Sequence, residues 1–276
     1  MKKLKNKELK GVILFSILTI VFNFIYSFVV KGRIGYLYPC LLFATFLALI
    51  LQTLFHRKTI FELGLFKPRL KTCLKSFLVN LIFISLIIIL DLIFKLTYLA
   101  SSLSKEIFFE LMLKVISSFF LTSFLALFTE ELAFRGYLID KLKSKRILKA
   151  IVLSSIVYGL WHLPFGLLNP FLNTLEAIIY SFNVCIRGFL FGYYYTKEFN
   201  LIPPALGHGI WDTMDYYLFG PVNGYGLIRG EDKTIYDGEF GLVGLIIHLI
   251  FGAIFFFKSL FFSAGYKPVI DKNSKG

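Results

Sequence analysis

Long apolar segments without charge constrain the fold of this chain more than any other feature of its sequence. Residues 11–30 and 34–55 contain no charged side chain, and about 20 such residues are enough to cross the roughly 30 Å of hydrocarbon in a bilayer. Only 17% of the 276 residues are charged, against about 25% in typical soluble domains. The sequence therefore predicts an all-α, polytopic membrane protein.

The apolar segments predict about eight transmembrane helices, at 11–30, 34–55, 77–94, 115–139, 147–163, 177–196, 203–219 and 240–257. They form one integral membrane domain in three parts. These are the N-terminal spans at 1–114, a core at 115–219, and an outward loop with the last span and tail at 220–276. The first apolar run is longer than the core of a signal peptide and has no small-residue cleavage pattern, so we expect a retained first span.

The basic residues lie between the spans and predict orientation rather than nucleic-acid binding. The net charge is +13, but no long polar segment carries a basic face interleaved with stacking aromatics, so no nucleic acid is expected as a partner. Of the 30 Lys and Arg residues, 21 lie on one side of the predicted spans and seven on the other. Positive residues concentrate in the cytoplasm, so both termini are expected there, in a bacterial cytoplasmic membrane.

Ionisable side chains inside apolar spans mark the candidate site, because they are costly in hydrocarbon and usually functional. Four places stand out: residues 129–135, residues 158–164, Arg187, and residues 208–212. At 1.5 Å per helical residue, Glu130, His162, His208 and Asp212 lie roughly 15, 22, 8 and 14 Å from the cytoplasmic ends of their spans, with an error of about 5 Å. We therefore expect them to meet around one polar cavity that faces the cytoplasm.

The spacing along each span predicts which side chains share a face. Glu131 and Arg135 are four residues apart and are expected to pair, whereas Glu130 points about 100° away from Glu131 and is free to face something else. His208 and Asp212 are also four apart and share a face.

A proline predicts a helix end beside the cavity. Pro164 disfavours helical geometry at the residue before it, so the fifth span is expected to end just after His162. Such an end inside the membrane is tolerated where it lines a water-filled cavity.

Three short motifs follow one another on these spans. They are Glu-Glu-x-x-x-Arg at 130–135, the His of Phe-x-x-x-His at His162, and His-x-x-x-Asn/Asp at His208 and Asp212. Each motif alone is weak, but all three in this order within an eight-span protein resemble the CPBP family of CAAX proteases and bacteriocin-processing enzymes. That family, also called Abi, includes the type II CAAX prenyl endopeptidases. The resemblance covers roughly residues 115–219.

The resemblance implies an intramembrane endopeptidase whose helices surround a conical cavity open to the cytoplasm. In the family, the first Glu and the His of the second motif are thought to activate water, which implies that Glu130 is the base and His162 its partner. The two residues of the third motif are thought to stabilise the oxyanion, which implies this role for His208 and Asp212.

Supporting roles follow for further residues. Glu131 and Arg135 would hold their helix in place. Tyr158 stands where the family motif has Phe, and its phenol could add a hydrogen bond. Arg187 lies inside a span and, with Asp91, either forms a structural pair or lines the cavity.

The role of Asp212 and the presence of a metal stay open at this stage. An ionised carboxylate cannot donate to an oxyanion, so Asp212 must be protonated, orient His208 or bind a metal. Glu130, His162 and His208 could supply three zinc ligands with an open fourth position, as in a metalloprotease. The chain has no His-Glu-x-x-His, and a metal-free glutamate mechanism uses the same residues. Its three cysteines, without clustered spacing, predict neither a disulfide nor a four-Cys zinc site.

Two other function classes are compatible with the sequence. The chain could be a non-catalytic membrane scaffold or bacteriocin-immunity protein, although all the catalytic-type residues are present. It could also be a proton-coupled transporter with Glu130 in a relay, although no inverted repeat is detectable.

The partners expected for a protease are the lipid bilayer and a membrane-associated peptide or protein as substrate. The ratio of 23 Lys to 7 Arg suggests an AT-rich bacterial genome. A peptide pheromone, a bacteriocin precursor or a membrane-protein segment is then a more natural substrate than a prenylated carboxyl terminus.

Overall fold

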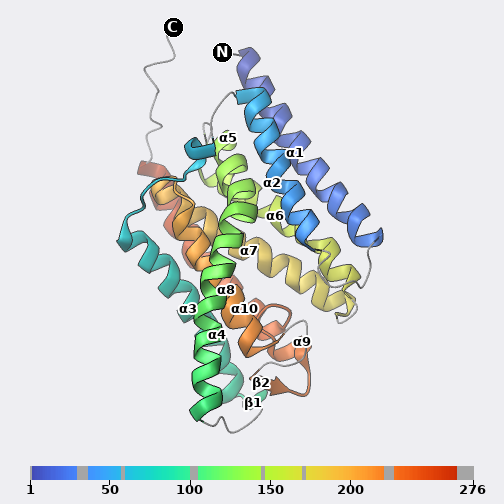
Figure 1. The fold of residues 1–276 in the computed structure, drawn as a ribbon, viewed down its shortest axis with the longest axis vertical. Helices are drawn as coiled ribbons and strands as arrows, with labels where there is room; N and C mark the ends of the chain where they lie inside the picture. Colours follow the sequence, from blue (N-terminus) through green and yellow to red (C-terminus); the bar gives the residue numbers. More distant parts are fainter. Residues whose placement is uncertain are drawn as a thin grey trace.

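The chain folds into a bundle of long helices (Figure 1). A computed structural model describes residues 2–29, 37–56, 60–99, 105–143, 147–169, 172–220 and 227–265. The long helices are α1 (Lys2–Val29), α2 (Leu37–His56), α3 (Leu70–Ile93), α4 (Lys105–Ala126), η2 (Leu127–Ile139), α6 (Ile147–Leu168), α7 (Thr174–Glu198), α8 (Ile202–Leu218) and α10 (Leu242–Gly265). The short elements are η1 (Ile60–Leu63), α5 (Asp140–Leu142), α9 (Lys233–Tyr236), β1 (Thr97–Leu99) and β2 (Ile228–Gly230).

Each of the eight predicted spans coincides with a long helix, which confirms the all-α polytopic fold. Two of them are shorter than the rest: the apolar part of α2 is limited to Pro39–Leu54, and α8 has 17 residues. Six described segments are long and apolar enough to cross a membrane, at Leu9–Val29, Leu70–Ile93, Phe108–Leu142, Ile147–Leu168, Thr174–Glu198 and Leu242–Phe261. Helix α1 begins and α10 ends at the same end of the molecule (Figure 1).

The helices that carry the candidate site pack closely against one another. Helix α6 lies along α7, while α8 packs against both α3 and α4. Glycines permit two of these approaches: a Cβ built at Gly159 would lie 2.7 Å from Cβ of Cys185, and one built at Gly209 would lie 1.9 Å from Oγ of Ser123. Any larger side chain at either position would therefore push two helices apart.

The start of α7 is fixed by a capping box. The side chain of Asn173 accepts a hydrogen bond from the backbone N–H of Glu176 (2.9 Å), and the carboxylate of Glu176 accepts one from the N–H of Asn173 (2.7 Å). Two otherwise unpaired donors at the helix N-terminus are thereby satisfied.

At the opposite end of the bundle from the start of α1, strands β1 and β2 pair antiparallel, with Tyr98 opposite Arg229 (Figure 1).

The expected helix end after His162 is wrong. Helix α6 continues through Pro164 to residue 168, although proline supplies no backbone N–H and displaces the carbonyl four residues before it. A neighbouring helix provides a donor in this turn, because Asn23 of α1 donates to the backbone carbonyl of Trp161. In a membrane protein such side-chain partners let a helix pass through a proline.

The fourth predicted span is α-helical only in its first part. At residue 127, α4 passes into η2, a π-helix of 13 residues. Side chains of neighbouring helices donate to its carbonyls: Thr45 of α2 to that of Thr129 (2.9 Å), and Ser154 of α6 to that of Phe134 (2.6 Å). π-Helices are rare, mostly a single turn long, and frequent at functional sites. This one carries the Glu-Glu-x-x-x-Arg motif.

Candidate active site

Glu130 is the centre of a cluster to which three segments contribute. It lies on η2, and its Oε2 accepts a hydrogen bond from the hydroxyl of Tyr158 on α6. Nε2 of His162, also on α6, lies 3.6 Å from the same oxygen, and Nε2 of His208 on α8 lies 3.8 Å from it. The Glu130 side chain is only 12% exposed. Residues separated by up to 78 positions therefore meet around one nearly buried carboxylate.

Glu131, the next residue, faces the interior. Its side chain is fully buried, its Oε1 accepts a hydrogen bond from Nδ1 of His208 (2.8 Å), and it forms an ion pair with Nη1 of Arg135 (3.2 Å). The predicted pairing of Glu131 with Arg135 is therefore present. The sequence did not predict the contact of Glu131 with His208. It also did not predict that the ring of Phe191 stacks on the imidazole of His208, with centroids 4.9 Å apart.

The neighbours of His162 indicate which of its ring nitrogens carries the proton in the neutral form. Nδ1 lies 2.9 Å from the backbone carbonyl of Tyr158, and a carbonyl can only accept. Nδ1 must therefore be protonated, so Nε2 of a neutral His162 presents a lone pair toward Glu130. The rings of Trp161 and Tyr180 contact the imidazole edge-on, with centroids at 4.7 and 5.8 Å, and hold its orientation.

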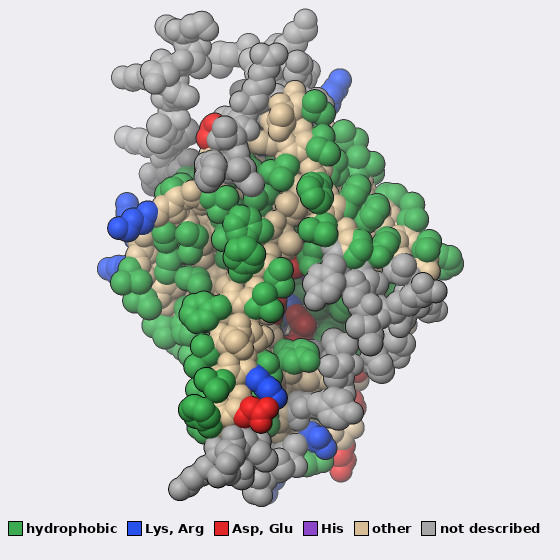
Figure 2. All heavy atoms as spheres, in the orientation of Figure 1, with side chains coloured by type: hydrophobic (Ala, Val, Ile, Leu, Met, Phe, Trp, Pro, Cys, Tyr) green, Lys and Arg blue, Asp and Glu red, His purple; other side chains and the backbone are tan. Residues whose placement is uncertain are grey.

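Asp212 lies at the solvent-exposed side of the cluster. Its Oδ2 lies 3.4 Å from Nε2 of His208, and 42% of its side chain is exposed, against 6% for His208. Figure 2 shows acidic side-chain atoms recessed in a hollow between hydrophobic surfaces. The Asp212 side chain is therefore the most exposed of the charged groups that contact His208.

Arg187 lies on α7 and is paired, but not with Asp91. Its guanidinium forms an ion pair with Glu239, just before α10, and stacks over the ring of Trp211 with a separation of 4.6 Å. Asn183 donates to the backbone carbonyl of Glu239 (2.9 Å), which ties the same segment to α7. Asp91 is fully buried and neither of its carboxylate oxygens has a hydrogen-bond partner within the described part of the chain. Of the two alternatives left open for Asp91 and Arg187, the structural pair is therefore wrong.

Glu239 is a charged residue that the sequence reasoning missed. It lies in the acidic loop at 220–239, outside every predicted span, so no rule about ionisable groups in hydrocarbon selects it. Its partner lies 52 positions earlier in the chain. The only sequence signal was the presence of an unpaired cation, Arg187, inside a span.

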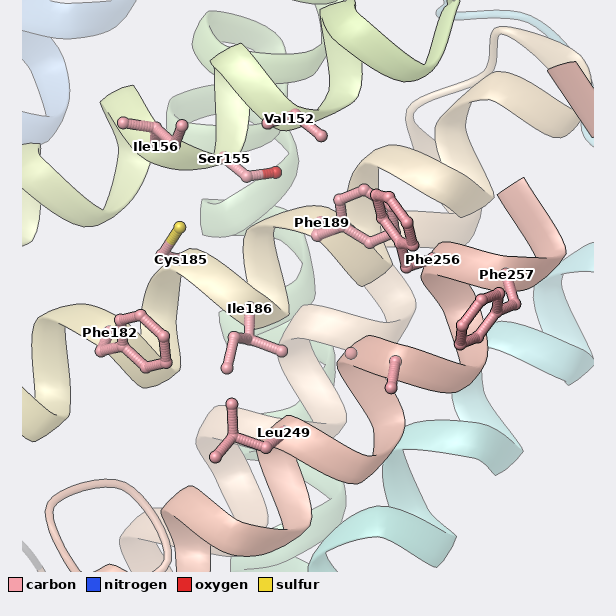
Figure 3. Close-up of a pocket in the computed structure, with 12 residues that line it drawn as sticks. Val152, Ser155, Ile156, Phe182, Cys185, Ile186, Phe189, Leu249, Phe256 and Phe257 are labelled. Carbon is pink, nitrogen blue, oxygen red and sulfur yellow. The ribbon is translucent and has the colours of Figure 1, made fainter. Parts of the chain in front are cut away.

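An apolar groove on the outside of the bundle is distinct from this cluster. It lies between α6, α7 and α10, has a volume of about 480 Å³, and is lined by residues such as Ile156, Phe182 and Leu249 (Figure 3). Cys185 points into it (Figure 3) and is a free thiol. Such a lining suits contact with hydrocarbon rather than hydrolysis.

Metal binding by this cluster depends on how its candidate ligands are placed. Across the residues that the structure describes, no three His, Cys, Asp or Glu side chains are placed to hold a metal ion together. His208 donates Nδ1–H to Glu131 and His162 donates Nδ1–H to the carbonyl of Tyr158, so the Nε2 atoms of both rings stay available, as ligation of a metal by histidine also requires.

Comparison with known proteins bears on the same segment. Residues 112–214 match the family described as type II CAAX prenyl endopeptidase Rce1-like, a family of proteases. No curated protein matches the chain. Together with the apolar helices, this match makes the chain an integral, multi-pass membrane protein. The match therefore agrees with the resemblance predicted from the three motifs, and it covers the segment that carries them, residues 112–214.

Proposed function

We propose that the chain is an intramembrane endopeptidase that hydrolyses a peptide bond of a membrane-associated peptide or protein. The observation that carries the proposal is the meeting of His162 and His208 at one oxygen of Glu130, at distances of 3.6 and 3.8 Å. A nearly buried carboxylate beside an imidazole is suited to act as a general base toward a water molecule within hydrogen-bond reach.

The proposed reaction begins with a water molecule that contacts Glu130 and His162. Its oxygen attacks the peptide carbonyl carbon while its proton passes to the Glu130 carboxylate. The carbonyl π bond opens and leaves a tetrahedral intermediate with a negatively charged oxygen. When the C–N bond breaks, the proton on Glu130 passes to the departing nitrogen. The products are a carboxylic acid and an amine, and Glu130 returns to its starting form.

His208 is the proposed stabiliser of that negative oxygen. Its Nδ1–H donates to Glu131 (2.8 Å), while its Nε2 faces the cluster 3.4 Å from Asp212. The carboxylates of Glu131, Asp212 and Glu130 all lie within 4 Å of the ring, and such neighbours stabilise a positive imidazolium. In that form Nε2 carries a proton and can donate to the oxyanion. We assign Asp212 the role of holding this charged form.

The test is peptide cleavage by proteoliposomes with the wild-type protein or the Glu130→Gln variant. Quenched fluorescent peptides would be supplied in two sets, one with a farnesyl group on a cysteine near the carboxyl terminus and one without lipid, and products identified by mass. We expect Glu130→Gln to lower cleavage by about 10²–10⁴-fold, the usual contribution of general-base catalysis.

Glu110→Gln is the matched control. Glu110 lies on α4, is 65% exposed, and pairs only at the surface with Lys114 (2.6 Å), so the same substitution there should leave cleavage unchanged. Cleavage by Glu130→Gln at the wild-type rate would refute the proposal, and so would the absence of cleavage by the wild-type protein in both peptide sets. A scaffold or immunity protein would give the second result, with protection retained in Glu130→Gln.

The two peptide sets also test the proposed substrate class. We propose that the natural substrate is an unprenylated membrane-associated peptide, such as a pheromone or bacteriocin precursor, cut from the cytoplasmic side. Preferential cleavage of the farnesylated set would contradict this choice. Protease accessibility of tags placed at the two termini in intact cells tests the expectation that both are cytoplasmic.

A further inference from the structure

One residue holds both partners of the water-activating pair, through different atoms. The hydroxyl of Tyr158 donates to Oε2 of Glu130, and the backbone carbonyl of Tyr158 accepts from Nδ1 of His162 (2.9 Å). The direction of the first bond is fixed, because an ionised carboxylate can only accept. Both His162 and Glu130 are thus oriented by a single position on α6.

The Tyr158 ring is itself held on several sides. The ring of Phe134 meets it edge-on with centroids 5.0 Å apart, and that of His162 does so at 4.5 Å. The guanidinium of Arg135 lies over its face, 4.2 Å from the centroid. Only 2% of Tyr158 is exposed. Its hydroxyl therefore has little freedom to move away from Glu130.

The two oxygens of Glu130 have unequal surroundings. Within the described residues, Oε2 accepts from Tyr158 and is the oxygen that the two imidazoles approach, whereas no contact of this kind involves Oε1. A hydrogen bond on one carboxylate oxygen leaves the other with its lone pairs available for a proton.

On the basis of the proposed hydrolysis, we propose that Tyr158 is a positioning residue that holds Oε2 of Glu130, so that Oε1 is the oxygen that takes the proton from water. The second motif of the family that this chain resembles has Phe at this place, and a Phe ring has no donor. The contact is therefore an addition of this chain to the general pattern, and not a requirement of the motif.

The test is Tyr158→Phe, which keeps the ring and removes the hydroxyl. In the proteoliposome assay, with the peptide that the wild type cleaves fastest, kcat should fall about tenfold to a hundredfold. This is the range for losing a hydrogen bond to a charged group. KM should stay within about a factor of two, because the hydroxyl contacts the base and not the bound peptide.

Tyr194→Phe is the matched control. Tyr194 is a buried tyrosine on α7 whose hydroxyl donates to the backbone carbonyl of Lys75 (3.3 Å), away from the cluster. Its loss should leave both constants unchanged. An equal fall in kcat for both variants would mean that removing any buried phenol hydroxyl loosens the bundle, and would overturn the proposal.

The outcomes separate this proposal from the proposed function. If Glu130→Gln is inactive while Tyr158→Phe keeps wild-type kcat, the positioning role is wrong and the hydrolysis stands. If the wild type cleaves no peptide, infrared difference spectra between wild type and Glu130→Gln still report the Glu130 carboxylate stretch. A hydrogen bond to one oxygen makes the two C–O bonds unequal, so this band should shift in Tyr158→Phe. An unchanged band would refute the contact.

Discussion

The buried pair of Glu131 and Arg135 should make folding and catalysis separable by mutation. Their side chains are 0% and 1% exposed, and Oε1 of Glu131 lies 3.2 Å from Nη1 of Arg135. Glu131→Leu would leave the arginine as an uncompensated charge in the bundle. Such a loss costs about 3–5 kcal/mol, a large part of the total stability of about 5–15 kcal/mol for a typical protein.

Removing both charges should cost much less than the sum of the two single changes. The double variant Glu131→Leu/Arg135→Met puts two apolar side chains in place of the pair, an exchange that is often nearly neutral. The double variant does not recover all of the lost stability, because the cation–π contact of Arg135 with the ring of Tyr158 disappears. That contact is worth about 0.5–2 kcal/mol. We expect a coupling free energy of about 2–3 kcal/mol between the two positions.

The double variant should regain stability relative to Glu131→Leu, but it should not regain peptide cleavage. Nδ1 of His208 donates to Glu131 in the wild type, and leucine offers no acceptor, so the double variant loses the group that fixes the protonated nitrogen. We expect it to fold and to remain at least about tenfold slower in peptide cleavage, since a hydrogen bond to a charged group is worth about 1.5–3 kcal/mol.

The measurement is reversible unfolding in mixed micelles by added SDS, followed by fluorescence. The chain has two tryptophans, and Trp161 and Trp211 are both buried within the bundle, so their emission reports its opening. If the two single changes simply add, within about 0.5 kcal/mol, the pair is not coupled and the reasoning from burial fails. A double variant that regains full activity would refute the role assigned to the contact with His208.

Three further predictions test other parts of the bundle. Glu239→Gln should lower the free energy of unfolding by about 3 kcal/mol, because it leaves Arg187 unpaired inside the bundle, and adding Arg187→Gln should recover part of this loss in the same unfolding assay. Gly209→Ala should destabilise by about 1–3 kcal/mol or more, because the new methyl would lie 2.7 Å from the backbone N of Ser123; an unchanged unfolding midpoint would contradict the close packing of α4 on α8. Asp212→Asn should change stability by no more than about 0.5 kcal/mol, as for exposed positions, yet lower kcat about tenfold by removing the charge beside His208. Wild-type kcat in this variant would exclude the role assigned to Asp212.

The bundle could be predicted from the sequence because its strongest signal is local. A span requires only length and apolar composition, and both can be counted along the chain. The same reasoning placed Glu130, His162 and His208 at roughly 15, 22 and 8 Å from the cytoplasmic ends of their spans, since the rise per helical residue is constant. That these side chains face one another followed from the motifs, because depth alone says nothing about direction.

The features that the sequence did not reveal depend on partners distant in the chain. Helix α6 passes through Pro164, and in the same turn Asn23, more than 130 positions earlier, donates to the backbone carbonyl of Trp161. The ion pair of Arg187 likewise depends on a loop residue, Glu239. The π-helical geometry of η2 leaves no trace in the apolar pattern, since residues 132–139 are buried on every side and therefore show no hydrophobic periodicity.

Glu130 and Glu131 are consecutive residues, and this explains how the side chains of the site keep their relative positions although they come from three segments. Nδ1 of His208 lies 2.8 Å from Glu131 and Nε2 lies 3.8 Å from Glu130, so consecutive residues of η2 contact the two nitrogens of one ring. Helix α8 is thereby docked on η2 through the imidazole itself. Because a displacement of about 1 Å between reacting groups can cost a hundredfold in rate, this direct bond between the helix of the proposed base and the helix of the proposed oxyanion donor protects the geometry. Movements elsewhere in the bundle then displace Glu130 and His208 together rather than apart.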